Sequence, residues 1–149
     1  GFTASTRCLA LDRVTADEDL ARLTGFPVGT KLVRALRSRR ANDQVVSTDE
    51  SYIPESIASG LTPELVESGI YKYLEGELGL GIATSRRIIT VEAATQADRD
   101  NIDLDGFNAV AVMRSHTFDT EGLMLEYTET HQRPEFFSNY TTVTRTQRP

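Results

Sequence analysis

The sequence predicts an α+β fold in which short helices flank an antiparallel β-sheet. Two observations lead to this class. Several β-prone segments are joined by short clusters of turn-forming residues, as in hairpins, and short segments with helix-capping signals lie between them. A chain of 149 residues is long enough for one substantial core and too short for two. We therefore expect residues 1–149 to form a single domain.

The chain begins with a predicted strand and a short helix. Residues 7–14 are rich in apolar and β-prone side chains and predict the first strand. Thr15 and Glu18 have the spacing of a capping box, in which each side chain binds a free backbone N–H of the other. We expect a helix that begins at Thr15 and ends at Gly25.

A hairpin is predicted next. Residues 31–41 and 45–53 are β-leaning and flank the turn-forming cluster Ala41-Asn42-Asp43-Gln44. Pro54 should end the second strand, because proline has no N–H to donate to a sheet.

The second half of the chain again alternates predicted helices with predicted strands. Thr62 and Pro63 predict the start of a helix, and Ile70 to Leu78 places apolar residues on one helical face. Thr95 starts another short helix, which ends near Gly106. The remaining segments predict strands: 82–94, a hairpin of 109–118 with 123–132, and a final strand over 140–146.

Composition excludes several classes of function. The net charge of −6 makes this chain by itself a poor nucleic-acid binder, because neutralising phosphates dominates that affinity. No apolar run reaches the roughly 18–20 residues that cross a bilayer, so we expect no membrane segment. The single cysteine, Cys8, cannot form an internal disulfide; we expect a buried, inert thiol in a cytoplasmic protein.

Motifs for catalysis and cofactors are missing from the sequence. It contains no Walker A or dinucleotide glycine pattern and no Gly-x-Ser-x-Gly elbow, so we expect no cofactor. His116 and His131 fall on neighbouring strands, but without clustered cysteines they do not predict a metal site. Glu126 and Glu129 have opposite parity on one strand, so a regular strand sends them to different faces and does not converge them for acid–base chemistry.

Arg37 and Arg39 are the strongest site candidates. Two residues apart on a strand, they point to the same face, where an anion would relieve their repulsion through bidentate hydrogen bonds. Asp49, on the returning strand, faces Arg37 only if the turn has an odd length; a two-residue turn would place it elsewhere. The spacing alone also fits a solvated strand face with surface ion pairs.

Four segments of the sequence resemble one family. Leu36 to Pro54 resembles the pattern Arg-Leu-Arg-x-Ala-Asp-Gly-x-Pro-x-x-x-Glu-x-Ser-Tyr-Ile-Pro of the UTRA domain, the effector-sensing half of GntR-type repressors of the HutC subfamily. Residues 69–75, 109–115 and 125–133 are similar to further segments of that family, in the same order and with similar spacing.

The resemblance implies a chorismate-lyase-like fold with an effector pocket between sheet and helices. It implies a cytoplasmic homodimer that contacts DNA only through a winged helix-turn-helix domain preceding Gly1. Arg37 and Arg39 match the arginines that hold a phosphate in sugar-phosphate-sensing members, Asp49 matches an acid that binds ligand hydroxyl or amino groups, and Tyr71 and Glu126 match further pocket residues. The implied function is a repressor's sensor of an anionic metabolite, such as a phosphorylated sugar.

Departures from the family pattern leave the ligand and two other functions open. The sequence has Asp49 where glutamate is usual, Gln132 at the position of a late tyrosine, and Gly69 where a small polar residue is common. One alternative is a chorismate-lyase-like enzyme, and another is a dimerisation domain that has lost its ligand. Tyr71 also fits packing in the core, and Glu126 also fits an exposed strand position.

Overall fold

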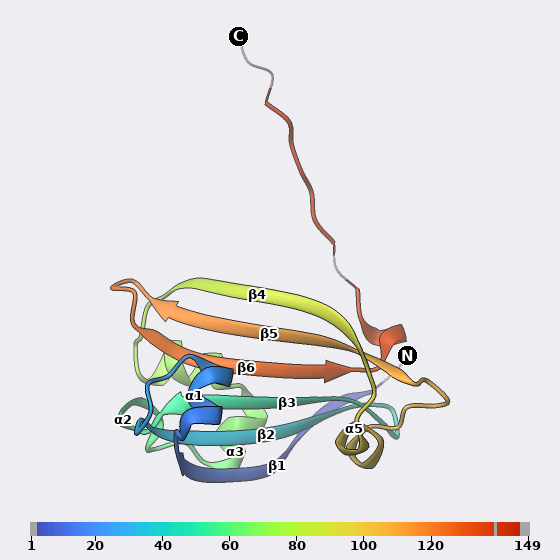
Figure 1. The fold of residues 1–149 in the computed structure, drawn as a ribbon, viewed down its shortest axis with the longest axis horizontal. Coiled ribbons are helices and arrows are strands. Elements are labelled where there is room, and N and C mark those ends of the chain that lie inside the picture. Colours follow the sequence, from blue (N-terminus) through green and yellow to red (C-terminus); the bar gives the residue numbers. More distant parts are fainter. Residues whose placement is uncertain (1–2, 139, 147–149) are drawn as a thin grey trace.

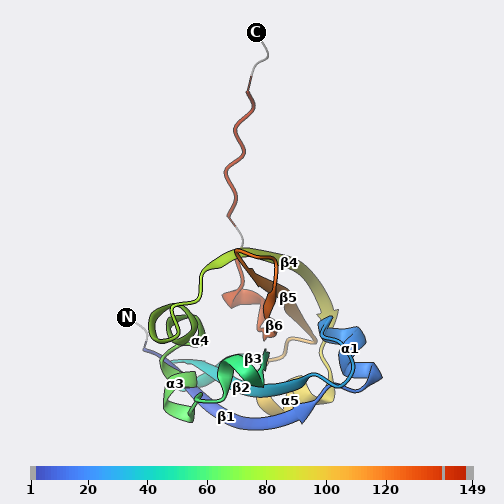
Figure 2. The same ribbon diagram turned by 90° about the vertical axis from the view of Figure 1, so that its left-hand side faces the viewer.

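The computed structural model describes residues 3–138 and 140–146. In them, one six-stranded antiparallel sheet has the order β1-β2-β3-β6-β5-β4 and curves around its helices (Figures 1 and 2). The predicted α+β class is confirmed. The strands are β1 Ala4–Thr15, β2 Lys31–Ala41, β3 Gln44–Pro54, β4 Ile82–Ala93, β5 Ala109–Asp119 and β6 Met124–Gln132. The helices are α1 Glu18–Thr24, α2 Glu55–Ala58, α3 Pro63–Ser68, α4 Ile70–Lys72 and α5 Gln96–Asn101, with a π-helical turn Tyr73–Glu77 and a 3-10 turn Pro134–Phe136.

Helix α1 begins later than the sequence predicts. Thr15 is the last residue of β1, and Asp17 caps the helix by accepting a hydrogen bond from the N–H of Leu20 at 2.8 Å. The expected capping box at Thr15 is therefore wrong, because the strand extends to Thr15 and the carboxylate of Asp17 takes the cap. Gly25 ends the helix as predicted, with a left-handed φ of 87° that favours glycine.

The β2–β3 hairpin has a two-residue turn, Asn42-Asp43, and yet Arg37 pairs directly with Asp49. The expectation that a two-residue turn separates them is wrong. The register shifts between Arg39 and Arg40, where Val46 is an extra residue on β3. This β-bulge supplies the odd residue that the turn does not, and so places Arg37 opposite Asp49.

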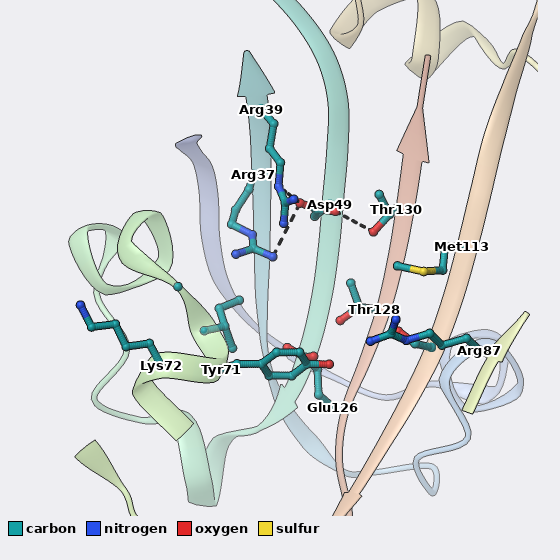
Figure 3. Close-up of a pocket in the computed structure, with 13 residues that line it drawn as sticks. Arg37, Arg39, Asp49, Tyr71, Lys72, Arg87, Met113, Glu126, Thr128 and Thr130 are labelled. Atoms are coloured by element: carbon teal, nitrogen blue, oxygen red, sulfur yellow. Dashed lines mark hydrogen bonds and ion pairs between the residues drawn. The ribbon is translucent and has the colours of Figure 1, made fainter. Parts of the chain in front are cut away.

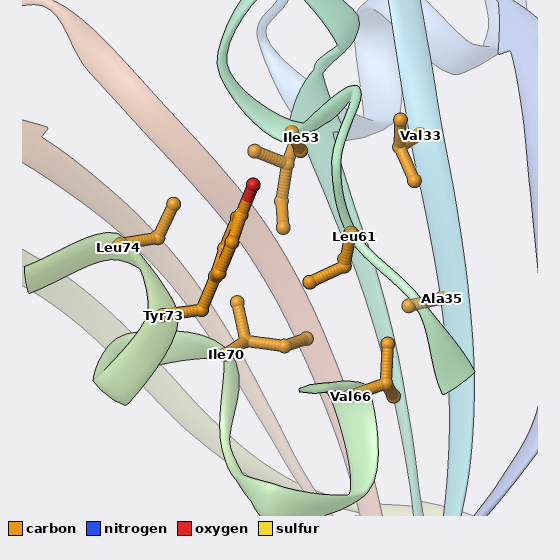
Figure 4. Packing of buried hydrophobic residues seen from close by; sticks show 9 residues of the cluster. Val33, Ala35, Ile53, Leu61, Val66, Ile70, Tyr73 and Leu74 are labelled. Atoms are coloured by element: carbon orange, nitrogen blue, oxygen red, sulfur yellow. The ribbon is translucent and has the colours of Figure 1, made fainter. Parts of the chain in front are cut away.

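Helices α2 to α4 cover one face of the sheet. Thr62 caps α3 and Pro63 is its first residue, as predicted. These helices bury an apolar cluster against β2 and β3 (Figure 4). Its members are Val33, Ala35, Ile53, Ala58, Leu61, Val66, Ile70, Tyr73 and Leu74. Cys8 is half-buried at the margin of the cluster rather than buried in it. The arginines continue the row of Val33 and Ala35 along β2, on the same face.

The other face is covered by α1 and α5. A second apolar cluster, which includes Phe26, Leu32, Tyr52 and Tyr127, lies under α1. Helix α5 starts after Thr95 as predicted, and Thr95 and Asp98 form a capping box there. The helix ends at Asn101, so the predicted end near Gly106 is wrong. No helix in the described ranges is long and apolar enough to cross a membrane.

Residues 140–146 do not form a strand, so that prediction is wrong for the single chain. They are exposed and belong to no helix or strand. They run away from the sheet (Figure 1). β-Branched residues favour an extended backbone, but a strand also needs a neighbour to accept and donate its hydrogen bonds.

Candidate functional site

A cavity of about 250 Å³ lies between the sheet and α4 (Figure 3). The five sequence-predicted site residues all line it. They are Arg37 and Arg39 from β2, Asp49 from β3, Tyr71 from α4 and Glu126 from β6. The strand parity brings them together, because alternate residues of each strand point to the face that α4 covers. The remaining lining residues are Gly69, Ile70, Lys72, Arg87, Met113, Ser115, Thr128 and Thr130.

Asp49 holds the two arginines at one end of the cavity. Its Oδ2 lies 3.0 Å from Arg39 Nε and 3.6 Å from Arg37 Nη2, and its Oδ1 accepts a 2.6 Å hydrogen bond from Thr130. The Arg37 side chain is only 12 % exposed, and its Nε is buried without a hydrogen-bond partner among the described residues. The Nε–H of Arg37 is therefore a donor that a ligand can pair with. Leaving such a donor of a buried charged group without a hydrogen bond is costly, so pairing it stabilises the complex.

Tyr71 and Glu126 form the other end. The Tyr71 hydroxyl lies 3.0 Å from Thr117 Oγ1, and Tyr71 is 39 % exposed. Burial raises the pKa of the Glu126 carboxyl, while the hydroxyl of Thr128 and the charge of Arg37 oppose the rise. Burial, and then the nearby Glu126, raise the pKa of Tyr71. The two groups therefore offer a hydroxyl and a carboxyl that readily holds a proton, which suits hydrogen bonding to polar ligand groups.

Arg87 on β4 is a site residue that the sequence analysis missed. Its guanidinium enters the cavity from the wall opposite Arg37 (Figure 3). Lys72 also lines the rim, but its ammonium points away from the other labelled groups (Figure 3). Three arginines thus face two carboxyl groups, in a chain whose overall charge is −6. This local excess of positive charge favours anions.

The glycine that departs from the family pattern has a backbone reason. Gly69 joins α3 to α4 with a φ of 130°, in the region that side chains other than hydrogen disfavour. Gln132 does not line the cavity; its amide donates to the Phe136 carbonyl at 2.8 Å. Neither position contributes a polar side chain to the site.

Comparison with known families identifies the chain. The UTRA domain family matches residues 1–138. The chain belongs to the UTRA family. This confirms the resemblance found in the sequence segments around Arg37 and Tyr71.

Relatives of this UTRA domain are bacterial transcription regulators. The regulator TreR of Bacillus subtilis is 35 % identical over 102 residues, which is 68 % of this chain and 43 % of that protein. The repressor NagR of the same species is 22 % identical over 138 residues, 93 % of this chain and 57 % of that protein. The chain thus spans about half the length of these relatives. The effector binding domain of the B. subtilis trehalose repressor TreR superposes with a TM-score of 0.87 at 27 % identity, over 96 % of this chain and 99 % of that one.

The opposite face of this UTRA domain carries a second cavity, of about 220 Å³, and a network of ion pairs lines it. Glu126 and Glu129 point to different faces, as their parity predicts. Glu129 lies 2.9 Å from Arg114 and 3.2 Å from His131 Nε2, and His131 Nδ1 lies 2.8 Å from Asp98 in α5. His116 is far along the sheet from His131, since they pair with Tyr127 and Val112 respectively. Among the described residues, no three or more histidine, cysteine, aspartate or glutamate side chains are placed so that they could hold a metal ion.

His131 should make stability fall as the pH rises. The hydrogen bond to Glu129, and then the charge of Asp98, raise its pKa above the ordinary 6.5, against the effect of burial. A raised folded-state pKa stabilises the fold fully below the unfolded value, and that contribution is lost as the pH rises through the folded value. We expect the thermal midpoint to fall between about pH 6 and pH 8 in the wild type, and to fall much less in His131→Gln. If the thermal midpoint fell equally with pH in the two proteins, His131 would not be the group responsible.

Proposed function

We propose that this UTRA domain binds a small anionic metabolite in the cavity and thereby controls the DNA binding of a larger, dimeric, cytoplasmic transcription repressor. The observation that carries the proposal is the cavity's charge: three arginines face two carboxyl groups, and Arg37 keeps a buried donor without a partner. The fit to relatives that are transcription regulators supports the regulatory half of the proposal.

The ligand's anionic group belongs at the Arg37–Arg39 end. An oxyanion there would accept hydrogen bonds from both guanidiniums, which Asp49 holds side by side. Hydroxyl groups of the same ligand would reach Asp49, Glu126 and Tyr71, whose oxygens accept or donate hydrogen bonds. A phosphorylated sugar combines these two features, and the cavity is of the right scale for a small metabolite.

Control of DNA binding requires the ligand to bind two arrangements of the repressor unequally. A ligand that bridges β2 and β6 to α4 stabilises the arrangement in which those elements are closed around it. The difference in the ligand's binding free energy between the two arrangements then biases the position of the part of the protein that contacts DNA. With a charge of −6, this domain itself does not supply that contact.

A comparison of phosphorylated and unphosphorylated sugars tests the proposal. The set should include glucose, trehalose, N-acetylglucosamine and their 6-phosphates, since one similar structure is that of a trehalose repressor. We expect at least one phosphorylated sugar to raise the melting temperature, because a ligand that binds only the folded state stabilises it. The parent sugar should raise it much less. Equal shifts with sugar and sugar phosphate would refute an anion site, and no shift with any anion tested would favour a ligand-free dimerisation domain.

A further inference from the structure

Glu126 is a buried carboxyl group without an ion-pair partner. It is 3 % exposed, and among the described residues no basic nitrogen lies within 4.0 Å of its oxygens. Arg37, the nearest source of positive charge acting on it, is paired with Asp49 instead. A buried ionised carboxylate without a paired cation is costly, whereas the protonated group is neutral and has a hydrogen to donate.

The surroundings of Glu126 favour the protonated form. The charged and titratable side chains that line the same cavity are Arg37 and Arg39 of β2, Asp49 of β3, Tyr71 and Lys72 of α4, and Arg87 of β4. Strand β5 contributes only uncharged side chains, Met113 and Ser115. Burial is the largest effect and raises the pKa of the Glu126 carboxyl above its ordinary value of 4.5, against the opposing effects of Thr128 and Arg37.

An anion bound at the Arg37–Arg39 end would favour the protonated form further. Its negative charge disfavours a second negative charge in the same cavity. An oxyanion bound to Arg37 also offsets the positive charge that opposes the protonation of Glu126. Both groups line one cavity of about 250 Å³, and salt screens buried charges much less than exposed ones.

We propose that this site takes up a proton together with its anionic ligand, and that Glu126 carries the proton. This rests on the anion site of the proposed function and adds regulation by pH. The protonated carboxyl donates a hydrogen bond to a ligand oxygen and does not repel the ligand's anionic group. Figure 3 shows Glu126 beside Tyr71, away from the arginine pair, so the two parts of the site contact different parts of one ligand.

The direction of the pH dependence follows from linkage. A carboxyl whose pKa rises on binding strengthens binding fully below its pKa in the free domain, and this contribution is lost as the pH rises through its pKa in the complex. The affinity for the anion therefore falls as the pH rises, by at most about tenfold per pH unit for one proton. The site then responds to two inputs, the concentration of the metabolite and the pH.

Sulfate is the probe for the first measurement, because its charge is constant between pH 5 and pH 9, whereas a phosphate ester titrates near pH 6. NMR of the labelled domain follows the carboxyl carbon of Glu126 and the Nε–H of Arg37 in one sample. We expect sodium sulfate to raise the midpoint pH of the Glu126 signal, relative to sodium chloride of equal ionic strength. Arg37→Ala should abolish this rise, and Arg34→Ala, which removes an arginine of the opposite face, should retain it.

The affinity for sulfate at several pH values is the second measurement. In the wild type we expect it to fall by more than about threefold between pH 5 and pH 9. In Glu126→Gln it should change less, because the amide keeps a hydrogen-bond donor and cannot ionise. His131 also titrates in this range, but it lies on the opposite face and is present in both proteins.

The two NMR signals separate the possible failures. A Glu126 midpoint that sulfate leaves unchanged, in a sample where the Arg37 signal moves, would overturn the proton uptake and leave the anion site standing. The same conclusion would follow from an equal pH dependence of affinity in the wild type and in Glu126→Gln. An Arg37 signal that neither sulfate nor any sugar phosphate moves would refute the anion site, and the proton uptake with it.

Discussion

Replacing Arg37 with alanine should weaken the binding of a sugar phosphate by roughly 10- to 100-fold, the cost expected when one hydrogen-bonded charged partner is lost. Arg37 is the more buried of the two arginines, and its Nε has no hydrogen-bond partner among the described residues. Isothermal titration of the best sugar phosphate from the thermal screen measures the effect. Arg37→Lys should recover only part of the affinity, because an ammonium cannot form the two parallel bonds of a guanidinium.

Arg34 provides the matched control on the same strand. It points to the opposite face, where it contacts Glu50 at 2.8 Å and Asp12 at 2.9 Å. Arg34→Ala removes the same charge from the same strand and should leave ligand affinity within about twofold, since its distance from the cavity lets salt screen the charge. If both variants weakened binding equally, the effect would be one of overall charge rather than of the site.

Replacing Leu74 with alanine should lower the free energy of unfolding by about 2–5 kcal/mol, the range for large-to-small changes in a core. Leu74 is 0 % exposed in the π-helical turn and packs among the cluster that joins α3 and α4 to the sheet (Figure 4). Its removal leaves a cavity beneath the helix that presents Tyr71. Urea unfolding followed by circular dichroism gives the difference.

Leu78, at the end of the same turn, is 39 % exposed and serves as the control. Leu78→Ala should cost less than about 1 kcal/mol, because less apolar surface leaves water there on folding. Similar losses in the two variants would mean that the turn does not anchor α4 through Leu74. A small loss in both would place the main stabilisation outside this cluster.

Local signals in the sequence predicted much of this fold. Turn-forming clusters and caps located both long hairpins, helix α3 at Thr62 and the start of helix α5 at Thr95. The errors arose where distant contacts decide the outcome. Thr15 has a capping pattern, but pairing with Lys31 on β2 keeps it in a strand. Residues 140–146 have the propensity of a strand and lack a neighbour in the same chain.

The candidate site was predictable only where a family pattern supplied what spacing could not. Parity put Arg37 and Arg39 on one face, but the β-bulge at Val46, which aligns Arg37 with Asp49, has no signature in the sequence. Arg87 was missed because its neighbour Arg86 is chemically identical, and only the pairing of Arg87 with Ser115 shows which of the two faces the cavity. Residues of β2, β4 and β6 meet at one cavity because of the order of the strands in the sheet, and the spacing of residues in the sequence does not reveal that order.

A crystal structure of this domain with its tightest-binding sugar phosphate would locate the bound anion. We expect the phosphate oxygens within hydrogen-bond distance of Arg37 and Arg39, and the sugar hydroxyls beside Tyr71 and Glu126. A phosphate bound elsewhere on the surface, with Arg37 still paired only to Asp49, would contradict it.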